Sequence, residues 1–417
     1  KVINAIVNGN TSGLSDNLKT AAAAARKELQ VAGSKGVLVT GVQDAAAQAM
    51  VLEFNASSEV LDTAALKYTR SGDINKVNQL VREMNAGQVG LLIMAGVNPA
   101  YTLANAAEFN VGLEKVGVSV ACSMMPDETA SLATHIAPTP HYLESWGDVQ
   151  IKQGEVSLTQ PTIKPLFDTR QFQESLVKWM DSDQSYYDYL KSTIVSAGVT
   201  SFNQAVQDGV VMTNAFAKAI SEEQTSATSD AAHAVTTLPQ TGFELTLYTK
   251  TSMGAGNQGN NPWLQEMPDP ITRATWDNYL TMSEADAKEL DLWLDRSTFF
   301  TEARNDANGG LNGKLANVTV NGVTIENVPV MVQPGQAKGS VGLALGYGNV
   351  AGTFDDETVG INAYPLFQNG SLTQGGVTIE KASGMHEFAV IQLHNTLMGR
   401  GDIVKETTLE IFNTKDK

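Results

Sequence analysis

The feature that most constrains the fold is an alternation of short apolar runs with helix-forming stretches between residues 15 and 121. Residues 36–41 (GVLVTG) and 89–96 are apolar runs bounded by glycine, and residues 118–121 form a third. Helical patterns lie around them at residues 15–30, 44–55, 75–86 and 103–116. Strands that alternate with helices of about 10–15 residues predict a parallel sheet with right-handed crossovers and helices on both faces.

A different pattern follows in the second half of the chain. Residues 182–220 are typical of helices, and residues 221–240 are a Ser/Thr/Ala-rich stretch typical of a surface connection. Short β-branched or alternating runs come next, at residues 243–249, 318–320, 323–325, 328–332, 341–345, 377–379 and 387–392. Asn321 and Gly322 separate two of these runs and predict a tight hairpin, because a primed turn needs positive φ at both central residues.

We therefore divide the chain into three parts. Residues 1–180 are predicted to form a Rossmann-like α/β domain, and residues 181–240 a helical connection with a polar linker. Residues 241–417 are predicted to form a β-barrel or a sandwich. The length of 417 residues exceeds the usual limit of one hydrophobic core, which agrees with such a division.

Charge and hydropathy narrow the classes of partner. Lys and Arg total 28 against 45 Asp and Glu, a formal charge of −17 that repels nucleic-acid phosphates and anionic lipid. We expect no nucleic-acid partner; the ordinary role of this acidity is solubility, although it also suits a basic partner such as a cytochrome surface. No run approaches the ~20 apolar residues that cross a bilayer, so no direct membrane span is expected.

Cysteine and histidine form no local metal-binding motif. Cys122 is the only cysteine, which excludes an internal disulfide, a Cys-rich zinc site and a cluster held by several thiolates of this chain. It follows an apolar strand and is predicted to be a small buried side chain. The closest pairs among the five histidines are six and eight residues apart; these are His135, His141, His233, His386 and His394.

Gly96, Asn98 and Pro99 form the candidate binding turn, where a predicted strand ends and a helix begins. Ligands of α/β folds bind at this position. Gly96 allows close approach of the backbone, and Asn98 can form a hydrogen bond to a ligand. The alternative is that Asn98 only caps or closes the turn, and the residue types alone favour this alternative.

Two further clusters are interpreted as structural. Asp127 and Glu128 are adjacent carboxylates without a histidine or third carboxylate at ligand spacing, and they are typical of an acidic first helical turn. GAGNQGNN at residues 254–261 lacks the Lys-Ser/Thr ending of a phosphate-binding loop, and we interpret it as a flexible loop of the C-terminal domain.

Several motifs, in this order and spacing, resemble the molybdopterin oxidoreductase superfamily. LLIMAGVNP at residues 91–99, MPDETA at 125–130 and QPTIKP at 160–165 resemble its third, Rossmann-like domain. LTMSEADA at residues 280–287 and the segment at 328–348 resemble its C-terminal domain, a double-psi β-barrel. The resemblance spans most of the chain.

Two motifs are similar to a particular branch, the iron–sulfur subunit of alternative complex III, a quinol:electron acceptor oxidoreductase. They are HYLESWGD at residues 141–148 and HNTLMGR at residues 394–400. This resemblance implies a location on the periplasmic side of the bacterial inner membrane, in a respiratory electron-transport complex. It implies multihaem cytochrome c subunits and integral membrane quinol-binding subunits as partners.

The same resemblance implies what this segment contains. No molybdopterin, no catalytic residue and no metal ligand are expected in it, and Gly96, Asn98 and Pro99 are expected to be a vestigial pterin-site turn. Iron–sulfur clusters are expected in a ferredoxin-like domain of the same subunit that follows Lys417, and earlier domains are expected before Lys1.

The leading hypothesis is a non-catalytic, pterin-free scaffold segment of a quinol:cytochrome c or quinol:oxidase oxidoreductase. Electron transfer needs cofactors, and one cysteine cannot hold a chain of clusters. The alternative is part of an active molybdopterin-dependent reductase of the polysulfide or thiosulfate type. A third hypothesis is an independent nucleotide-binding protein that uses the Asn98 turn.

Overall fold

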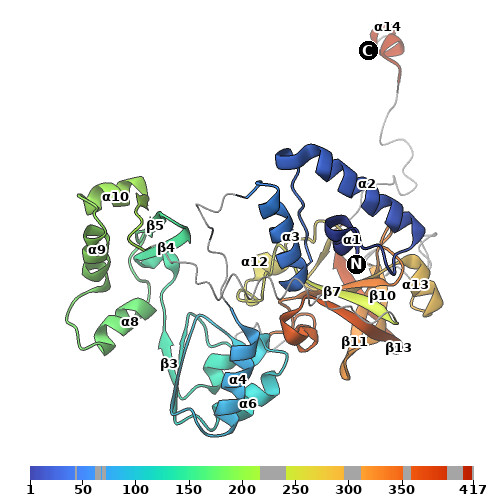
Figure 1. Cartoon of the computed structure of the whole chain (residues 1–417). Coiled ribbons are helices and arrows are strands. Elements are labelled where there is room, and N and C mark those ends of the chain that lie inside the picture. The colour runs from blue at the N-terminus through green and yellow to red at the C-terminus, as the bar shows by residue number, and fades with distance from the viewer. Residues whose placement is uncertain are drawn as a thin grey trace.

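The computed structural model describes residues 1–42, 45–61, 67, 72–216, 241–294, 311–350, 358–391 and 407–415. These residues form a mixed α/β fold with a parallel three-stranded sheet, a small antiparallel sheet and a large mixed sheet. The three sheets occupy separate regions of Figure 1. His233, the linker at residues 221–240 and the motif at 394–400 lie outside the described residues.

The parallel sheet lies at the centre of the predicted α/β region. It contains β1 (Leu91–Ala95), β2 (Val118–Ser123) and β3 (His135–Pro138), in the order β1-β2-β3. All pairs are parallel, with Leu91 opposite Val118. The strands predicted at residues 89–96 and 118–121 are therefore confirmed.

Helices cover one face of this sheet. They are α4 (Ile74–Asn85) before β1, α5 (Pro99–Thr102) and α6 (Ala106–Leu113) between β1 and β2, and α7 (Glu128–Leu132) between β2 and β3. The helix predicted over residues 103–116 is therefore shorter and is preceded by a separate turn of helix. One core joins helices and sheet, with Met84, Phe109 and Leu113 of the helices buried against Met94.

The other face of the sheet is open. Leu91 is 58% exposed, and Ile93 and Val118, which alternation places on the same face, are also exposed. The prediction of helices on both faces is wrong for the part of the chain that the structure describes.

The predicted strand at residues 36–41 does not form. Val39 is 80% exposed, and no ladder pairs this segment with β1 among the described residues. The side-chain amide of Asn55 donates to the carbonyl oxygen of Leu38 at 2.8 Å and accepts from its N–H at 3.0 Å. These two bonds satisfy backbone groups that a neighbouring strand would otherwise satisfy.

Three helices form the N-terminal part. They are α1 (Val2–Asn8), α2 (Asp16–Ala32) and α3 (Ala45–Ser57), with a 3-10 turn η1 (Gly33–Lys35) after α2. α1 packs against both α2 and α3. The guanidinium of Arg26 donates to the carbonyl oxygen of Ile6 at 2.9 Å, which satisfies an acceptor at the end of α1.

A small unit follows the parallel sheet. Its antiparallel sheet has the order β4 (Gly147–Lys152), β5 (Glu155–Thr159), β6 (Val210–Met212), and its helices are α8 (Phe172–Trp179), α9 (Tyr186–Ser196) and α10 (Phe202–Asp208). Val156, Ile194 and Val211 share one core. Of the helices predicted over residues 182–220, the structure describes the part up to residue 216, where α10 ends at Asp208 because Gly209 takes the left-handed conformation and the chain continues as β6.

The large mixed sheet contains seven strands among the described residues. They are β7 (Phe243–Thr249), β8 (Ala274–Thr275), β9 (Leu280–Met282), β10 (Leu311–Val320), β11 (Val323–Val332), β12 (Ser340–Leu345) and β13 (Thr373–Val390). Their order is β10-β11-β9-β12-β7-β13-β8, and β13 also pairs with β10. β12 is parallel to β7 and antiparallel to β9, which makes the sheet mixed.

Short helices connect these strands. They are α12 (Pro262–Gln265), α13 (Glu284–Glu289), η4 (Tyr364–Leu366) and η5 (Gln368–Gly370), and α14 (Leu409–Thr414) lies apart from the rest in Figure 1. The predicted hairpin between β10 and β11 is confirmed, with φ of 46° at Asn321 and 83° at Gly322. Several predicted short runs merge into longer strands, since the runs at 377–379 and at 387–390 are both parts of β13.

Tyr101 joins the parallel sheet to the large sheet. Its side chain is in the core of the large sheet, where its hydroxyl donates to the carbonyl oxygen of Tyr347 at 2.7 Å and its ring lies edge-on to Tyr364. A Cβ at Gly256 would come within 3.0 Å of the Tyr101 ring, so glycine makes room for it. Burial raises the pKa of Tyr101, and the hydroxyl remains a donor at neutral pH.

Tyr101→Phe should lower the free energy of unfolding by about 1–2 kcal/mol, because the Tyr347 carbonyl loses its buried donor. Urea denaturation of the full chain measures this change. Tyr142→Phe is the matched control, since Tyr142 is 67% exposed and the same atom is removed. Equal effects of the two substitutions would contradict a structural role for the Tyr101 hydroxyl.

Candidate functional site

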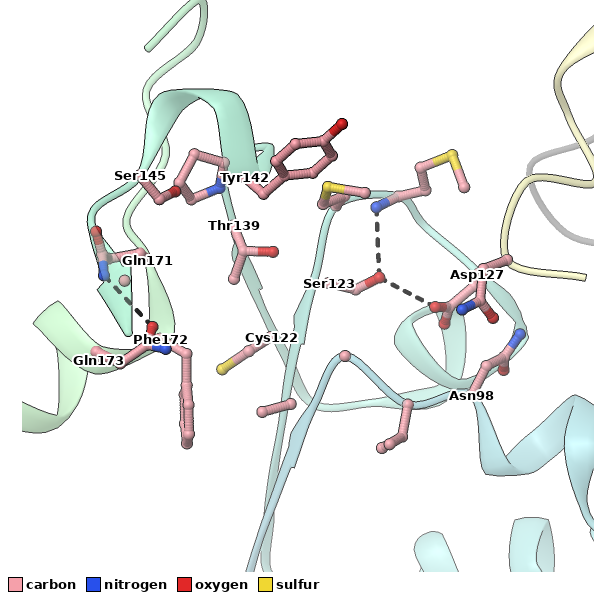
Figure 2. Close-up of a pocket in the computed structure, with 18 of the residues that line it drawn as sticks. Asn98, Cys122, Ser123, Asp127, Thr139, Tyr142, Ser145, Gln171, Phe172 and Gln173 are labelled. Carbon is pink, nitrogen blue, oxygen red and sulfur yellow. Dashed lines mark hydrogen bonds between the residues drawn. The ribbon is translucent and has the colours of Figure 1, made fainter. Parts of the chain in front are cut away.

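A cavity of about 630 Å³ lies between the parallel sheet, the small unit and a loop of the large sheet. It is placed at the carboxyl ends of β1, β2 and β3, the usual ligand position in α/β folds. Figure 2 shows Asn98, Ser123 and Asp127 on one side and Gln171, Phe172 and Gln173 on the other.

The predicted binding turn borders this cavity. Gly96 and Asn98 line it, and Pro99 is the first residue of α5. Gly96 has a φ of 63°, which lets the chain turn sharply between β1 and α5.

Both polar atoms of the Asn98 side chain bind protein groups. Its Nδ2 donates to Glu128 Oε2 at 2.7 Å, and its Oδ1 accepts from the Thr129 hydroxyl at 2.7 Å and the Thr129 N–H at 3.1 Å. It does not cap α5 with its side chain. Instead it joins the turn after β1 to the start of α7, so its polar atoms bind protein groups.

Asp127 and Glu128 belong to the first turn of α7, as predicted. Asp127 is the N-cap and accepts from the Ala130 N–H at 2.8 Å, and its other oxygen accepts from the Ser123 hydroxyl at 3.0 Å. Glu128 Oε1 accepts from the N–H of Val350 at 2.8 Å, which ties α7 to the large sheet. Both carboxylates also line the cavity.

The small unit contributes a third carboxylate and aromatic rings. Asp148, in β4, accepts from the hydroxyl of Tyr186 at 2.9 Å. Tyr142, Trp146 and Phe172 also line the cavity. A capping box fixes the chain just before β4. In it, His141 and Glu144 cap the 3-10 turn η2 (Tyr142–Glu144), which leads into β4.

Sequence reasoning missed the third wall of the cavity. Gly256, Asn257, Gly259 and Asn260 line it, all from the stretch that was interpreted as a flexible loop. Its high glycine and asparagine content was the available signal, because such residues allow tight turns that expose backbone and amide groups.

The lining of the cavity is acidic. The described residues that line it include Asp127, Glu128 and Asp148 but no lysine, arginine or histidine. Such a lining attracts cations and repels anions.

Cys122 lines the cavity but is buried, and burial raises the pKa of its thiol. A raised thiol pKa lowers the thiolate fraction, so this cysteine is a poor nucleophile. Among the described residues, no group of three or more His, Cys, Asp or Glu side chains could hold a metal ion. Within the same residues, no helix has both the length and the apolar character needed to cross a membrane.

A second cluster of titratable groups lies in the large sheet. Lys250 Nζ donates to the carbonyl oxygen of Asp277 at 2.8 Å and lies 4.1 Å from the ring centre of Tyr279. Burial lowers the pKa of Lys250 to about 8, although the charges of Asp269 and Asp277 oppose this shift. The Asp277 carboxylate also forms a hydrogen bond with the His386 ring, and this bond raises the pKa of His386. None of these side chains lines the cavity.

Comparison with known proteins shows likeness of fold. No protein-family model and no curated protein matches this chain. Acetylene hydratase from Pelobacter acetylenicus, a molybdopterin oxidoreductase family member, has a similar structure, with a TM-score of 0.52 at 14% sequence identity. The match covers 74% of this chain and 46% of the hydratase, so the chain spans less than half the length of that protein.

Asn98→Ala should lower the free energy of unfolding by about 2 kcal/mol, because it leaves the buried Thr129 and the half-buried Glu128 of α7 without their hydrogen bonds to this side chain. Urea denaturation measures this loss. Asn257→Ala, at an exposed residue of the same cavity, should change stability by less than about 0.5 kcal/mol. A large effect at Asn257 together with none at Asn98 would overturn the structural role of Asn98.

Lys250→Met should make stability depend less on pH above neutrality. Lys250 has a pKa of about 8 in the folded chain and 10.5 as the reference value, so the folded chain releases this proton first. Wild-type stability should therefore rise relative to Lys250→Met between about pH 8 and 10.5, by at most about 1.4 kcal/mol per pH unit. Urea denaturation at several pH values measures the difference.

Lys288→Met is the control for this measurement, because the Lys288 side chain is 53% exposed. The effect of Lys250→Met on stability should change with pH more than the effect of this control does. An effect of Lys250→Met that is independent of pH would contradict the buried, poorly solvated position of Lys250.

Proposed function

We propose that this chain is a non-catalytic, pterin-free scaffold segment of the iron–sulfur subunit of a quinol-oxidising respiratory complex, of the alternative complex III type. The parent complex is the quinol oxidoreductase, and this segment holds a neighbouring cluster domain in position. The fold likeness to acetylene hydratase supports a molybdopterin oxidoreductase-like architecture. The motif at residues 141–148 carries the more specific assignment.

The charge of the cavity is the observation that carries the pterin-free assignment. A pterin dinucleotide contains an anionic pyrophosphate, which proteins hold with cationic side chains, free backbone N–H groups or helix N-termini. Here the described lining residues present Asp127, Glu128 and Asp148 and no cationic side chain. Three carboxylates without a cationic side chain repel an anionic dinucleotide.

The vestigial turn supports the same proposal. Asn98 uses both polar atoms of its side chain within the protein, toward Glu128 and Thr129. The N-terminus of α7 is capped by Asp127, whose carboxylate takes the place that a ligand anion would need. The turn therefore keeps its shape, and the polar groups of Asn98 and Asp127 form hydrogen bonds within the protein.

The large sheet is proposed to be a double-psi-type β-barrel. β13 pairs with β7 and also with β10, an arrangement that such a barrel would use. Parallel pairs, β7 with β12 and β9 with β11, interrupt the antiparallel ones.

The remaining parts of the proposal concern the assembly. Multihaem cytochrome c subunits and integral membrane quinol-binding subunits are the proposed partners, on the periplasmic side of the bacterial inner membrane. Iron–sulfur clusters are proposed for a ferredoxin-like domain of the same subunit. The acidic charge of −17 would suit a basic surface on a cytochrome partner.

Elemental analysis of the purified complex that contains this chain tests the proposal. We expect iron in clusters and haem, and molybdenum far below one atom per complex, because the acidic cavity disfavours the pterin dinucleotide. Stoichiometric molybdenum would overturn the scaffold role. It would favour the alternative, part of an active molybdopterin-dependent reductase of the polysulfide or thiosulfate type.

A further inference from the structure

The cavity is large, and carboxylates and aromatic rings line it. A purely structural role requires neither property. We propose that it binds an aliphatic polyamine, with ammonium groups at carboxylates on two sides of the cavity and methylene groups against aromatic rings. This inference depends on the cavity alone and does not rest on the scaffold role.

The volume of the cavity is that of a ligand site. Protein interiors hold few voids larger than a water molecule, whereas small-molecule sites measure about 300–1,000 Å³. The cavity measures about 630 Å³, and its lining comes from the parallel sheet, the small unit and a loop of the large sheet. A space of this size suits a flexible ligand of drug size or smaller.

Two carboxylates of the cavity have only neutral partners among the described residues. Asp127 accepts from the Ala130 N–H and the Ser123 hydroxyl, and Asp148 accepts from the Tyr186 hydroxyl. Neither carboxylate forms an ion pair within the described part of the chain. Their negative charges therefore remain available to a cationic ligand, and Glu128 adds a third charge to the lining.

These carboxylates belong to different units. Asp127 lies at the end of the parallel sheet, and Figure 2 shows it across the cavity from Gln171 and Phe172 of the small unit, the unit that carries Asp148. A ligand with a single ammonium group satisfies one carboxylate. A flexible chain with an ammonium group at each end satisfies both, which favours a polyamine over a simple amine.

Aromatic side chains supply the apolar part of the site. Tyr142 and Phe172 line the cavity beside Trp146. Methylene groups bury apolar area against such rings, and an ammonium group over a ring face gains a further cation–π attraction. A lysine of a partner protein offers the same ammonium chemistry, but one side chain fills only a part of about 630 Å³, so a free polyamine is favoured.

Calorimetric titration of the full chain tests the inference, with spermidine as the probe. We expect saturable binding with one spermidine per chain, weakened by added salt because the attraction is between charges. Propylamine, with a single ammonium group, should bind about tenfold more weakly, as expected for the loss of about 1.4 kcal/mol. Adenosine monophosphate, an anion, should not bind.

Two isosteric variants locate the site. Asp127→Asn keeps a side-chain oxygen that can cap α7, and Asp148→Asn keeps one that can accept from Tyr186, while each removes a charge. Each should weaken spermidine binding by roughly threefold to tenfold without changing the melting temperature. Asp183→Asn, at an exposed aspartate of the small unit outside the cavity, should have no effect.

Three results would overturn the inference: no spermidine binding, binding that neither cavity variant weakens, or equal binding of the nucleotide anion. Weak binding that Asp183→Asn reduces equally would indicate general attraction to an acidic surface and would also overturn it. None of these results bears on the scaffold role, which the molybdenum content of the complex decides separately.

Discussion

The hydroxyl of Tyr101, 2.7 Å from the carbonyl oxygen of Tyr347, joins the parallel sheet to the large mixed sheet. The position of the cavity depends on this contact, because α5 carries Tyr101 directly after the turn that lines one wall. Gly256, from the loop that forms the third wall, leaves the space that the ring occupies. A buried donor that finds one acceptor is costly to displace, so this pair, together with the bond from the Val350 N–H to Glu128, holds the two sheets in their relative position.

Electrostatics differ between the two clusters of charged groups. In the large sheet, the buried Lys250 has carboxylates and aromatic rings as neighbours, so its charge is partly compensated. In the cavity, Asp127 and Asp148 accept from neutral donors. Neutral hydrogen bonds orient a carboxylate without cancelling its charge, and the field extends into the open space. The first cluster therefore stabilises a core, whereas the second gives the cavity a preference for charge.

Local patterns predicted much of the fold, and non-local contacts explain most of the errors. β1 and β2 follow from short apolar runs, β7 and β12 follow from alternating or β-branched runs, and Asn321 with Gly322 predicted the hairpin between β10 and β11, because these features act within a few residues. The run at residues 36–41 has the same composition as a strand, yet the amide of Asn55 takes its backbone groups. The acidic start of α7 was predicted, but its bonds to Asn98 and Val350 depend on chain folding.

The open face of the parallel sheet has a consequence for handling the chain by itself. β1 has an unpaired outer edge among the described residues. Leu91, Ile93 and Val118 are exposed on the open face of the same sheet. An edge of this kind is a template on which a second copy can add its own strand. The charge of −17 keeps copies apart in dilute buffer, but salt shortens the reach of that repulsion. Colloidal stability of the isolated chain is therefore set by ionic strength more than by its folding free energy.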